Sequence, residues 1–366
     1  MDYEFLMSRA LMLAQKAEGE TEHYPMVGAI LVKNGKVIAE GYFKGPGKPH
    51  AEVNAIKKAG KRARGASLIV NLEPCCHYGR TPPCTDAIIT AGIKEVIAGM
   101  KDPNPLVNGG GFRNLRNAGI KVRSGVLERE CRFLNRHFIK FITTRTPWVI
   151  LKLALTADGK LADRYGDSKW ITDEPARRYV HKLRSKVQVV MVGIGTVLKD
   201  DPELSVRLGG KKRKPRPLVV DEGLRIPLRA KVLRTQAEAG AIIACVEKAD
   251  TKKKRTLEKL GAEVIETKAD KNGLLSLKEL LRRLGEKKIA VLLCEGGARL
   301  AGGLLERGLV DEVQFFYSPK LLIDGKGLVG VMGEEARKIQ EAISLIQPKI
   351  ERIGLDFLLS GLLREV

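Results

Sequence analysis

The sequence predicts an α/β protein made of two domains. Three observations support this prediction: the chain has 366 residues, strand-like apolar runs alternate with helical patterns, and a polar break ending in Pro147 interrupts them at residues 143–147. A chain of this length exceeds one ordinary domain. Alternating strands and helices indicate a sheet with helices packed on its faces. We therefore expect one domain at residues 1–146 and a second at residues 147–366.

The first domain shows closely spaced elements. The tight turn expected at Asn34-Gly35 joins two strand-like runs, which is typical of a β-hairpin. The expected elements are a helix at 3–18, strands at 27–32 and 37–42, a helix at 51–59, a strand at 67–72, a helix at 85–91, a strand at 95–100, a loop at 102–105, and then a helix, a strand and a helix to about residue 141.

The second domain repeats the alternation after the break. Strands are expected at 148–155, 187–193, 218–221, 241–246, 263–267, 289–294 and 312–317, with helices between several of them. Ligand sites in such domains lie where loops leave the carboxyl ends of strands.

The formal net charge of +22 indicates a protein that attracts anions. Its basic runs at 211–214 and 252–255 contain no aromatic residues, so they lack stacking platforms for bases. Phosphorylated small molecules are the partners that we expect, and nucleic acid is not.

The chain shows no sign of export or membrane insertion. No run of about 20 apolar residues is long enough to span a bilayer. The N-terminal segment is acidic and lacks a signal-peptide pattern. Six cysteines in this length do not form a disulfide framework. We expect a cytoplasmic protein with no membrane partner, and we also expect a homo-oligomer.

The most informative segment contains His50-Ala51-Glu52, then Pro74-Cys75, and then Pro82-Pro83-Cys84. One imidazole and two thiolates hold a zinc ion with its fourth position open, as in catalytic rather than structural sites. Prolines before both cysteines favour helix starts, where a thiolate is stabilised. Glu52 is placed to move protons, because zinc base deaminases pair this ligand pattern with such a glutamate.

Other interpretations of this segment are open. The cysteines can be ordinary buried or free thiols, and Cys76 can compete with Cys75 for a metal. The same motif also fits a deaminase that acts on a flipped nucleic-acid base, although the second domain has no role in that account. A zinc-stabilised nucleic-acid-binding protein without catalysis is a further alternative, and it requires a fourth protein ligand.

The second domain carries a separate glycine-rich signal. Residues 293–303 combine a buried strand, the turn Glu295-Gly296-Gly297 and a helix start. Backbone N–H groups in such a turn can approach a phosphate. Gly193-Ile194-Gly195 lacks the third glycine of the dinucleotide fingerprint. The pattern indicates an anion or nucleotide site without defining its ligand.

Taken together, these motifs resemble the RibD family of bifunctional riboflavin-biosynthesis proteins over nearly all of residues 1–330. The matching motifs are His50-Ala51-Glu52, Glu73-Pro74-Cys75, residues 79–84, residues 102–105, Lys152, Asp158-Gly159, residues 168–172, residues 195–198, residues 200–204 and Glu295-Gly296-Gly297. The resemblance implies a cytidine-deaminase-like α/β/α domain followed by a dihydrofolate-reductase-like α/β domain.

The resemblance also implies two consecutive reactions. The first removes the 2-amino group of 2,5-diamino-6-(5-phosphoribosylamino)pyrimidin-4-one, with one Zn²⁺ per chain on His50, Cys75 and Cys84 and proton transfer by Glu52. The second reduces the ribosyl group of 5-amino-6-(5-phosphoribosylamino)uracil with NADPH. Two departures stand out, Tyr24 in place of an asparagine that is expected to read the pyrimidine edge, and Cys76 where the family has another residue.

The reductase residues follow from the same resemblance. NADPH is expected at Ala154, Trp170, Thr196, Asp200, Glu222, Gly297, Ala298, Arg299, Leu300, Ala301, Gly302 and Gly303. Substrate is expected at Lys152, Ser168, Arg184, Leu204, Arg207 and Glu295. Arg184 and Arg207 suit phosphate binding because guanidinium groups bind phosphate in a bidentate way, although either can equally form a surface ion pair.

Overall fold

The computed structural model describes residues 2–209, 214–234, 237–270, 273–334 and 337–366. The basic residues 211–213 therefore lie outside the described part of the chain. The chain divides into two compact units, Met1–Arg145 together with Val366, and Thr146–Glu365. Each unit contains its own sheet and its own hydrophobic core. No helix within the described ranges has the length and apolar character that crossing a bilayer requires.

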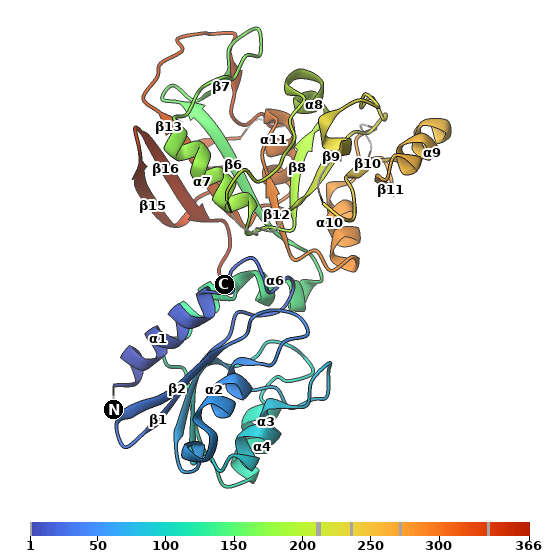
Figure 1. Ribbon diagram of the computed structural model, residues 1–366. Coiled ribbons are helices and arrows are strands. Elements are labelled where there is room, and N and C mark those ends of the chain that lie inside the picture. Colours follow the sequence, from blue (N-terminus) through green and yellow to red (C-terminus); the bar gives the residue numbers. More distant parts are fainter. Residues whose placement is uncertain (1, 210–213, 235–236, 271–272, 335–336) are drawn as a thin grey trace. The chain divides into compact units, whose positions relative to one another are not determined.

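The first unit is built on a five-stranded sheet in the order β2-β1-β3-β4-β5, counted over the described residues (Figure 1). Its strands are β1 (Gly28–Lys33), β2 (Lys36–Tyr42), β3 (Ser67–Leu72), β4 (Glu95–Met100) and β5 (Lys121–Ser124). Its helices are α1 (Tyr3–Gln15), α2 (Ala51–Ala59), η1 (Gly60–Ala63), α3 (Cys84–Thr90), α4 (Gly110–Asn117), α5 (Glu128–Leu134) and α6 (Arg136–Thr144). The expected hairpin turn is present, with φ of 50° at Asn34 and 74° at Gly35.

Two glycines allow helices to pack closely on this sheet. A Cβ on Gly28 would lie 2.0 Å from the Ala10 carbonyl oxygen of α1, and a Cβ on Gly41 would lie 2.3 Å from the Ala51 carbonyl oxygen of α2. Gly28 pairs with Tyr42 and Gly41 pairs with Ala29, so the two glycines face opposite sides of the sheet. Helices α1 and α2 therefore cover opposite faces, and α2 is held against the strands that precede it.

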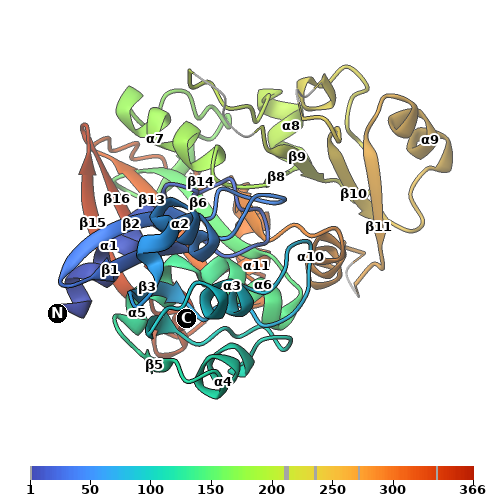
Figure 2. The ribbon, with the colours of Figure 1, turned by 60° about the horizontal axis from the view of Figure 1, so that its bottom comes forward.

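The second unit is built on a nine-stranded sheet in the order β11-β10-β9-β8-β12-β6-β13-β16-β15, as far as the described residues show. Figure 2 shows β8 to β11 side by side. The strands are β6 (Trp148–Thr156), β8 (Val189–Gly193), β9 (Arg216–Val220), β10 (Ile242–Val246), β11 (Glu263–Thr267), β12 (Val291–Cys294), β13 (Glu312–Ser318), β15 (Ile346–Ile353) and β16 (Asp356–Leu362), while β7 (Lys160–Ala162) and β14 (Leu328–Val329) pair separately. The helices are α7 (Glu174–Arg184), α8 (Ile194–Asp200), η2 (Lys231–Arg234), α9 (Thr251–Lys259), α10 (Leu277–Glu286), α11 (Ala298–Glu306) and η3 (Ile339–Glu341).

The α/β class that the sequence predicts is confirmed, one expected helix ends earlier than predicted, and one hairpin is additional to the prediction. The first helix ends at Gln15 rather than at residue 18, because Ala17 and Glu18 form tight turns that lead to Gly19 at φ 84°. The hairpin of β15 and β16 was not expected. It adds antiparallel strands to the edge of a sheet whose other pairs are parallel.

A candidate zinc centre and a buried charged cluster

Three donor atoms converge in the first unit. The Nδ1 atom of His50 lies 3.1 Å from the Cys84 Sγ and 3.6 Å from the Cys75 Sγ. All three donor atoms lie within 4.8 Å of one another. His50 precedes α2, Cys75 follows β3, and Cys84 is the first residue of α3. The turns between sheet and helices therefore bring together three residues that lie far apart in the sequence.

These donors fit a zinc ion. Tetrahedral zinc with ordinary Zn–N and Zn–S bonds places its ligand atoms about 3.5–3.8 Å apart, close to the separation of His50 and Cys75. The Thr81 hydroxyl lies 3.3 Å from His50 Nε2, which leaves Nδ1 toward the thiols. The hydrogen bond between the two thiols lowers the pKa of Cys75 and raises the pKa of Cys84, so the pair shares its proton in a way that favours a thiolate at Cys75.

Cys76 does not join this group. Its Sγ lies 3.9 Å from the carbonyl oxygen of Leu106, and a Cβ on Gly110 would lie 2.9 Å from it. The described group of mutually close donors contains His50 and the other two cysteines of the segment. The geometry therefore favours Cys75 over Cys76 as a partner of His50 and Cys84.

Glu52 lies beside these donors in the first turn of α2. Glu52 is only 3% exposed to solvent. Burial raises the pKa of the Glu52 carboxyl above its usual value. A carboxyl group beside the three donors is placed to accept and donate protons.

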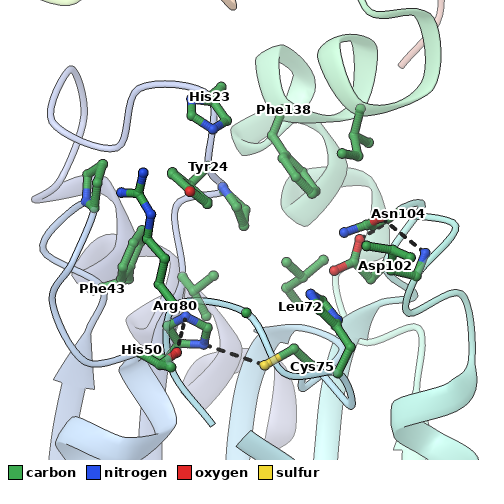
Figure 3. Close-up of a pocket in the computed structure, with 18 of the residues that line it drawn as sticks. His23, Tyr24, Phe43, His50, Leu72, Cys75, Arg80, Asp102, Asn104 and Phe138 are labelled. Atoms are coloured by element: carbon green, nitrogen blue, oxygen red, sulfur yellow. Dashed lines mark hydrogen bonds between the residues drawn. The ribbon is translucent and has the colours of Figure 1, made fainter. Parts of the chain in front are cut away.

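His50, Glu52 and Cys75 line a cavity of about 530 Å³, a volume typical of a small-molecule site. Figure 3 shows His50 and Cys75 at its base, Tyr24 and Phe43 on one wall, and Asp102 with Asn104 on the other. Lys48, Arg80 and Arg145 also line the cavity and bring positive charge to it. The cavity thus offers an aromatic wall, a polar wall and cations for an anionic group.

The polar wall is anchored by a buried carboxylate. Glu73 accepts hydrogen bonds from the backbone N–H groups of Asp102, Gly109 and Phe112 at 3.1, 3.0 and 3.1 Å. Asp102 in turn accepts from the N–H of Asn104 at 2.8 Å. Burial raises the pKa of the Asp102 carboxyl to about 7. The sequence alone assigns no role to the motif at 102–105, whereas the structure places the side chains of Asp102 and Asn104 in the cavity.

The second unit contains a buried cluster of charges. Arg184 donates to both carboxylate oxygens of Glu295, and Lys152 Nζ lies 3.7 Å from the same carboxylate. Their side chains are 16%, 7% and 14% exposed. Burial opposes ionisation of Glu295, but the charges of Arg184 and Lys152 outweigh it and lower the pKa to about 2. Burial lowers the pKa of the Lys152 ammonium, although the Glu295 carboxylate opposes that shift.

Arg184 also organises the segment that follows α8. Its Nη1 donates to the carbonyl oxygen of Ser205 at 2.9 Å, so three of its five N–H donors are used within the protein. The backbone N–H of Arg207 donates to His181 Nδ1 at 3.3 Å. The Arg207 side chain is exposed and pairs with Glu203 at 3.2 Å. Sequence reasoning missed His181, which lies one helical turn before Arg184 on α7.

The glycine-rich turn lies against a second turn from β8. Gly296 and Gly297 both have positive φ, near 97° and 99°, immediately before α11. The N–H of Gly193 donates to the Gly296 carbonyl, and a Cβ on Gly297 would lie 3.9 Å from the Thr196 hydroxyl. The structure therefore brings Thr196 next to the start of α11, where backbone N–H groups are available to a phosphate.

The remaining expected reductase residues are more dispersed. Ala154 lies on β6 and Asp200 ends α8. Trp170 is 66% exposed, and its ring lies under the Arg177 guanidinium at 4.6 Å.

Ser168 accepts from the N–H of Ile171 through its backbone carbonyl. Glu222 follows β9, which the sheet order separates from β12 by β8. Leu204 is buried at φ 52°.

Comparison with known proteins identifies related families and structures. Residues 1–100 match the cytidine and deoxycytidylate deaminase zinc-binding region, and residues 147–359 match the RibD C-terminal domain. The riboflavin biosynthesis protein RibD of Aquifex aeolicus is 44% identical over 96% of each chain, and that of Escherichia coli is 40% identical over 97% of this chain and 98% of its own.

Solved structures agree with these matches. A structure of Acinetobacter baumannii RibD superposes with a TM-score of 0.87 at 33% identity and covers 98% of each chain. A deaminase/reductase from Thermotoga maritima superposes with a TM-score of 0.84 at 40% identity, covering 98% of this chain and 97% of its own.

Proposed function

This chain belongs to the RibD family of bifunctional riboflavin-biosynthesis enzymes, and we propose that the first unit holds its deaminase site and the second its reductase site. It acts on small molecules. The proposed first reaction removes the 2-amino group of 2,5-diamino-6-(5-phosphoribosylamino)pyrimidin-4-one. The proposed second reaction reduces the ribosyl group of 5-amino-6-(5-phosphoribosylamino)uracil to a ribityl chain.

The observation that carries the deaminase proposal is the convergence of three donors beside a buried carboxyl group. His50, Cys75 and Cys84 would hold one zinc ion. Bound zinc supplies a water activated for attack at neutral pH. Glu52, buried in the same cavity with a raised pKa, would take a proton from the attacking water and pass it to the leaving amine.

The reductase proposal rests on the buried charged cluster and the glycine turn. Lys152 and Arg184 bring two basic groups to this site beside Glu295, which suits a phosphorylated substrate. NADPH supplies the hydride when bound. The N–H groups at the start of α11 and the Thr196 hydroxyl would receive its phosphates. The other residues expected from the resemblance, including Glu222, complete this site in the proposal.

Two finer features belong to the same proposal. We propose that the enzyme works in the cytoplasm, because its six cysteines are free in the structure and free cysteines are typical of proteins in a reducing compartment. We also propose that it forms a homo-oligomer. Gel filtration with light scattering tests the second feature.

One coupled assay tests both activities. The purified protein is supplied with the diaminopyrimidine phosphate, with or without NADPH, and the products are identified by mass spectrometry. Without NADPH the deaminated phosphoribosylaminouracil should accumulate, and with NADPH the ribityl compound should replace it. Failure of the first conversion would reject the deaminase proposal, and failure of only the second would reject the reductase proposal.

A further inference from the structure

Tyr24 stands in the cavity where the family resemblance leads us to expect an asparagine. An amide group offers two N–H donors and one carbonyl acceptor, whereas a phenol offers a single O–H group and a broad aromatic face. Tyr24 therefore cannot reproduce the hydrogen bonds of an amide to a ring edge. Its contribution to recognition must come from a different part of its chemistry.

Tyr24 belongs to a continuous row of rings on one wall of the cavity. The ring of His23 lies 4.2 Å from that of Tyr24 with an interplanar angle of 34°. Phe43 meets Tyr24 edge-on at 6.2 Å and then meets His50 edge-on at 5.5 Å. We call His23, Tyr24 and Phe43 the aromatic shelf. It reaches from a candidate zinc ligand along the cavity, and Figure 3 shows it facing the wall of Asp102 and Asn104.

The backbone under the shelf is held rigidly. The N–H of Tyr24 donates to the Thr21 carbonyl at 2.9 Å, and Pro25 fixes the next φ angle. Immediately after it, the carbonyl of Met26 accepts hydrogen bonds from the buried amides of Asn71 and Asn135. A shelf fixed in this way can bind a flat ligand with little loss of conformational freedom.

The accessible part of Tyr24 is turned to the cavity. The residue is half-buried and lines the cavity together with Phe43. Among the described residues, no partner forms a hydrogen bond with the Tyr24 hydroxyl. The polar groups that can recognise a ring edge, on Asp102 and Asn104, lie on the opposite wall.

We propose that Tyr24 determines specificity in the deaminase site by packing its ring against the face of the substrate's pyrimidine. This inference rests on the proposed deaminase function. Aromatic rings prefer offset-stacked or edge-to-face contacts, which make them suitable partners for a planar heterocycle. The contact is one of binding, because Tyr24 takes no part in proton transfer.

The test uses the full-length, zinc-loaded protein and three substitutions. Tyr24→Phe keeps the ring, Tyr24→Leu removes it, and Tyr24→Asn installs the amide. Tyr42→Leu is a matched control, since Tyr42 is a partly buried tyrosine of β2 outside the cavity lining. KM and kcat for deamination are measured, together with zinc content. Substrate affinity is also measured by calorimetry in a Glu52→Gln background, where no turnover interferes.

Loss of one base–aromatic stack should raise KM and the dissociation constant about 5- to 100-fold in Tyr24→Leu and Tyr24→Asn, with kcat and zinc content little changed. Tyr24→Phe and Tyr42→Leu should stay within about 2-fold of their parent. Unchanged affinity in Tyr24→Leu, or equal losses in Tyr24→Phe and Tyr24→Leu, would overturn the proposal. Tighter binding by Tyr24→Asn would do so as well.

The calorimetric arm separates this inference from the proposed function. A parent protein that binds the pyrimidine in a Tyr24-dependent way without deaminating it would reject the activity and support the stack. Normal deamination by the parent, together with a substrate affinity that does not change when Tyr24 is replaced, would support the activity and reject the stack.

Discussion

Asn135 holds the backbone of Met26 from both sides. Its Oδ1 accepts from the Met26 N–H at 2.8 Å, and its Nδ2 donates to the Met26 carbonyl at 3.1 Å. Asn135 is 1% exposed and lies at the junction of α5 and α6. Helix α6 carries Phe138 into the cavity, while the segment before Met26 carries Tyr24. One buried amide therefore joins two walls of the cavity.

Replacing this amide should destabilise the first unit. Asn135→Ala leaves the buried N–H of Met26 without an acceptor, which should lower the free energy of unfolding by about 1–3 kcal/mol. Urea denaturation of the full-length protein, followed by a probe specific to the first unit, measures the change. Asn117→Ala, at an exposed position of α4, is the control and should change it by less than about 0.5 kcal/mol. Equal effects of the two substitutions would contradict the role given to Asn135.

Zinc should be bound at about one equivalent per chain and should depend on Cys84. Cys84→Ser removes one of the three converging donors and should lose the metal. Cys76→Ser is a matched control, because its Sγ lies beside the Leu106 carbonyl and should leave the zinc content unchanged. Metal analysis of the purified variants measures both. Full zinc occupancy in Cys84→Ser would show that the ligand set is wrong.

Glu52→Gln should retain zinc and the fold but lose deaminase activity. The amide fills the same buried space without carrying a proton, and placed carboxylates contribute about 10²- to 10⁴-fold to rate. Deamination is measured by product analysis, with zinc content determined in parallel. Reduction of the already deaminated substrate is the internal control and should be unchanged. Near-normal deamination in this variant would remove Glu52 from the mechanism.

Glu295 should make the stability of the second unit depend on pH in the acid range. Its pKa of about 2 in the folded protein lies below the ordinary 4.5, so its ionised form stabilises the fold above pH 4.5. That contribution is lost as the pH falls from 4.5 toward 2. At neutral pH, Glu295→Gln leaves Arg184 and Lys152 without their counter-charge and should cost about 3–5 kcal/mol.

The measurement is urea unfolding of the parent and of Glu295→Gln at several pH values. The difference between them should be largest above pH 4.5 and shrink toward pH 2. Glu203→Gln, which removes the exposed partner of Arg207, should change stability by about 1 kcal/mol at most. A difference that stays constant with pH would show that Glu295 is not held ionised by its neighbours.

The second unit should act without the first. We predict that a fragment of residues 147–366 oxidises NADPH with the deaminated phosphoribosylaminouracil and is inactive on the diamino precursor, whose amino group leaves only at the zinc site. NADPH should be preferred over NADH, because basic surroundings favour its additional phosphate. Absorbance of both cofactors with both pyrimidines measures this. A folded fragment that is inactive in all four combinations would show that the reductase site needs residues before 147.

Much of the fold could be predicted because local patterns and packing agree. The hairpin at Asn34-Gly35 has one favoured turn geometry, and the apolar strands are buried as expected. The final hairpin could not be predicted in the same way. Strand β15 carries mostly exposed residues at the edge of its sheet, so no alternation of buried and exposed positions marks it in the sequence.

The two candidate sites differ in how much of each could be predicted from the sequence. The zinc site is predictable because its thiol, imidazole and carboxyl groups form a motif whose chemistry can be recognised from the residue types and their spacing. Arg184 is different, because its sequence context suits phosphate binding and a surface ion pair equally well. The structure shows a third arrangement, a buried bidentate pair with Glu295 that also holds Ser205. Long-range partners of this kind depend on tertiary packing.

The strand order of the large sheet has a consequence for the order in which the chain folds during synthesis. The five strands of the first sheet are contiguous in sequence, so this unit can fold and bind its metal while the rest of the chain is still being translated. The second sheet places β16 directly beside β13. The hydrogen-bonding edge of β13 therefore stays open to mispairing until residues 356–362 emerge.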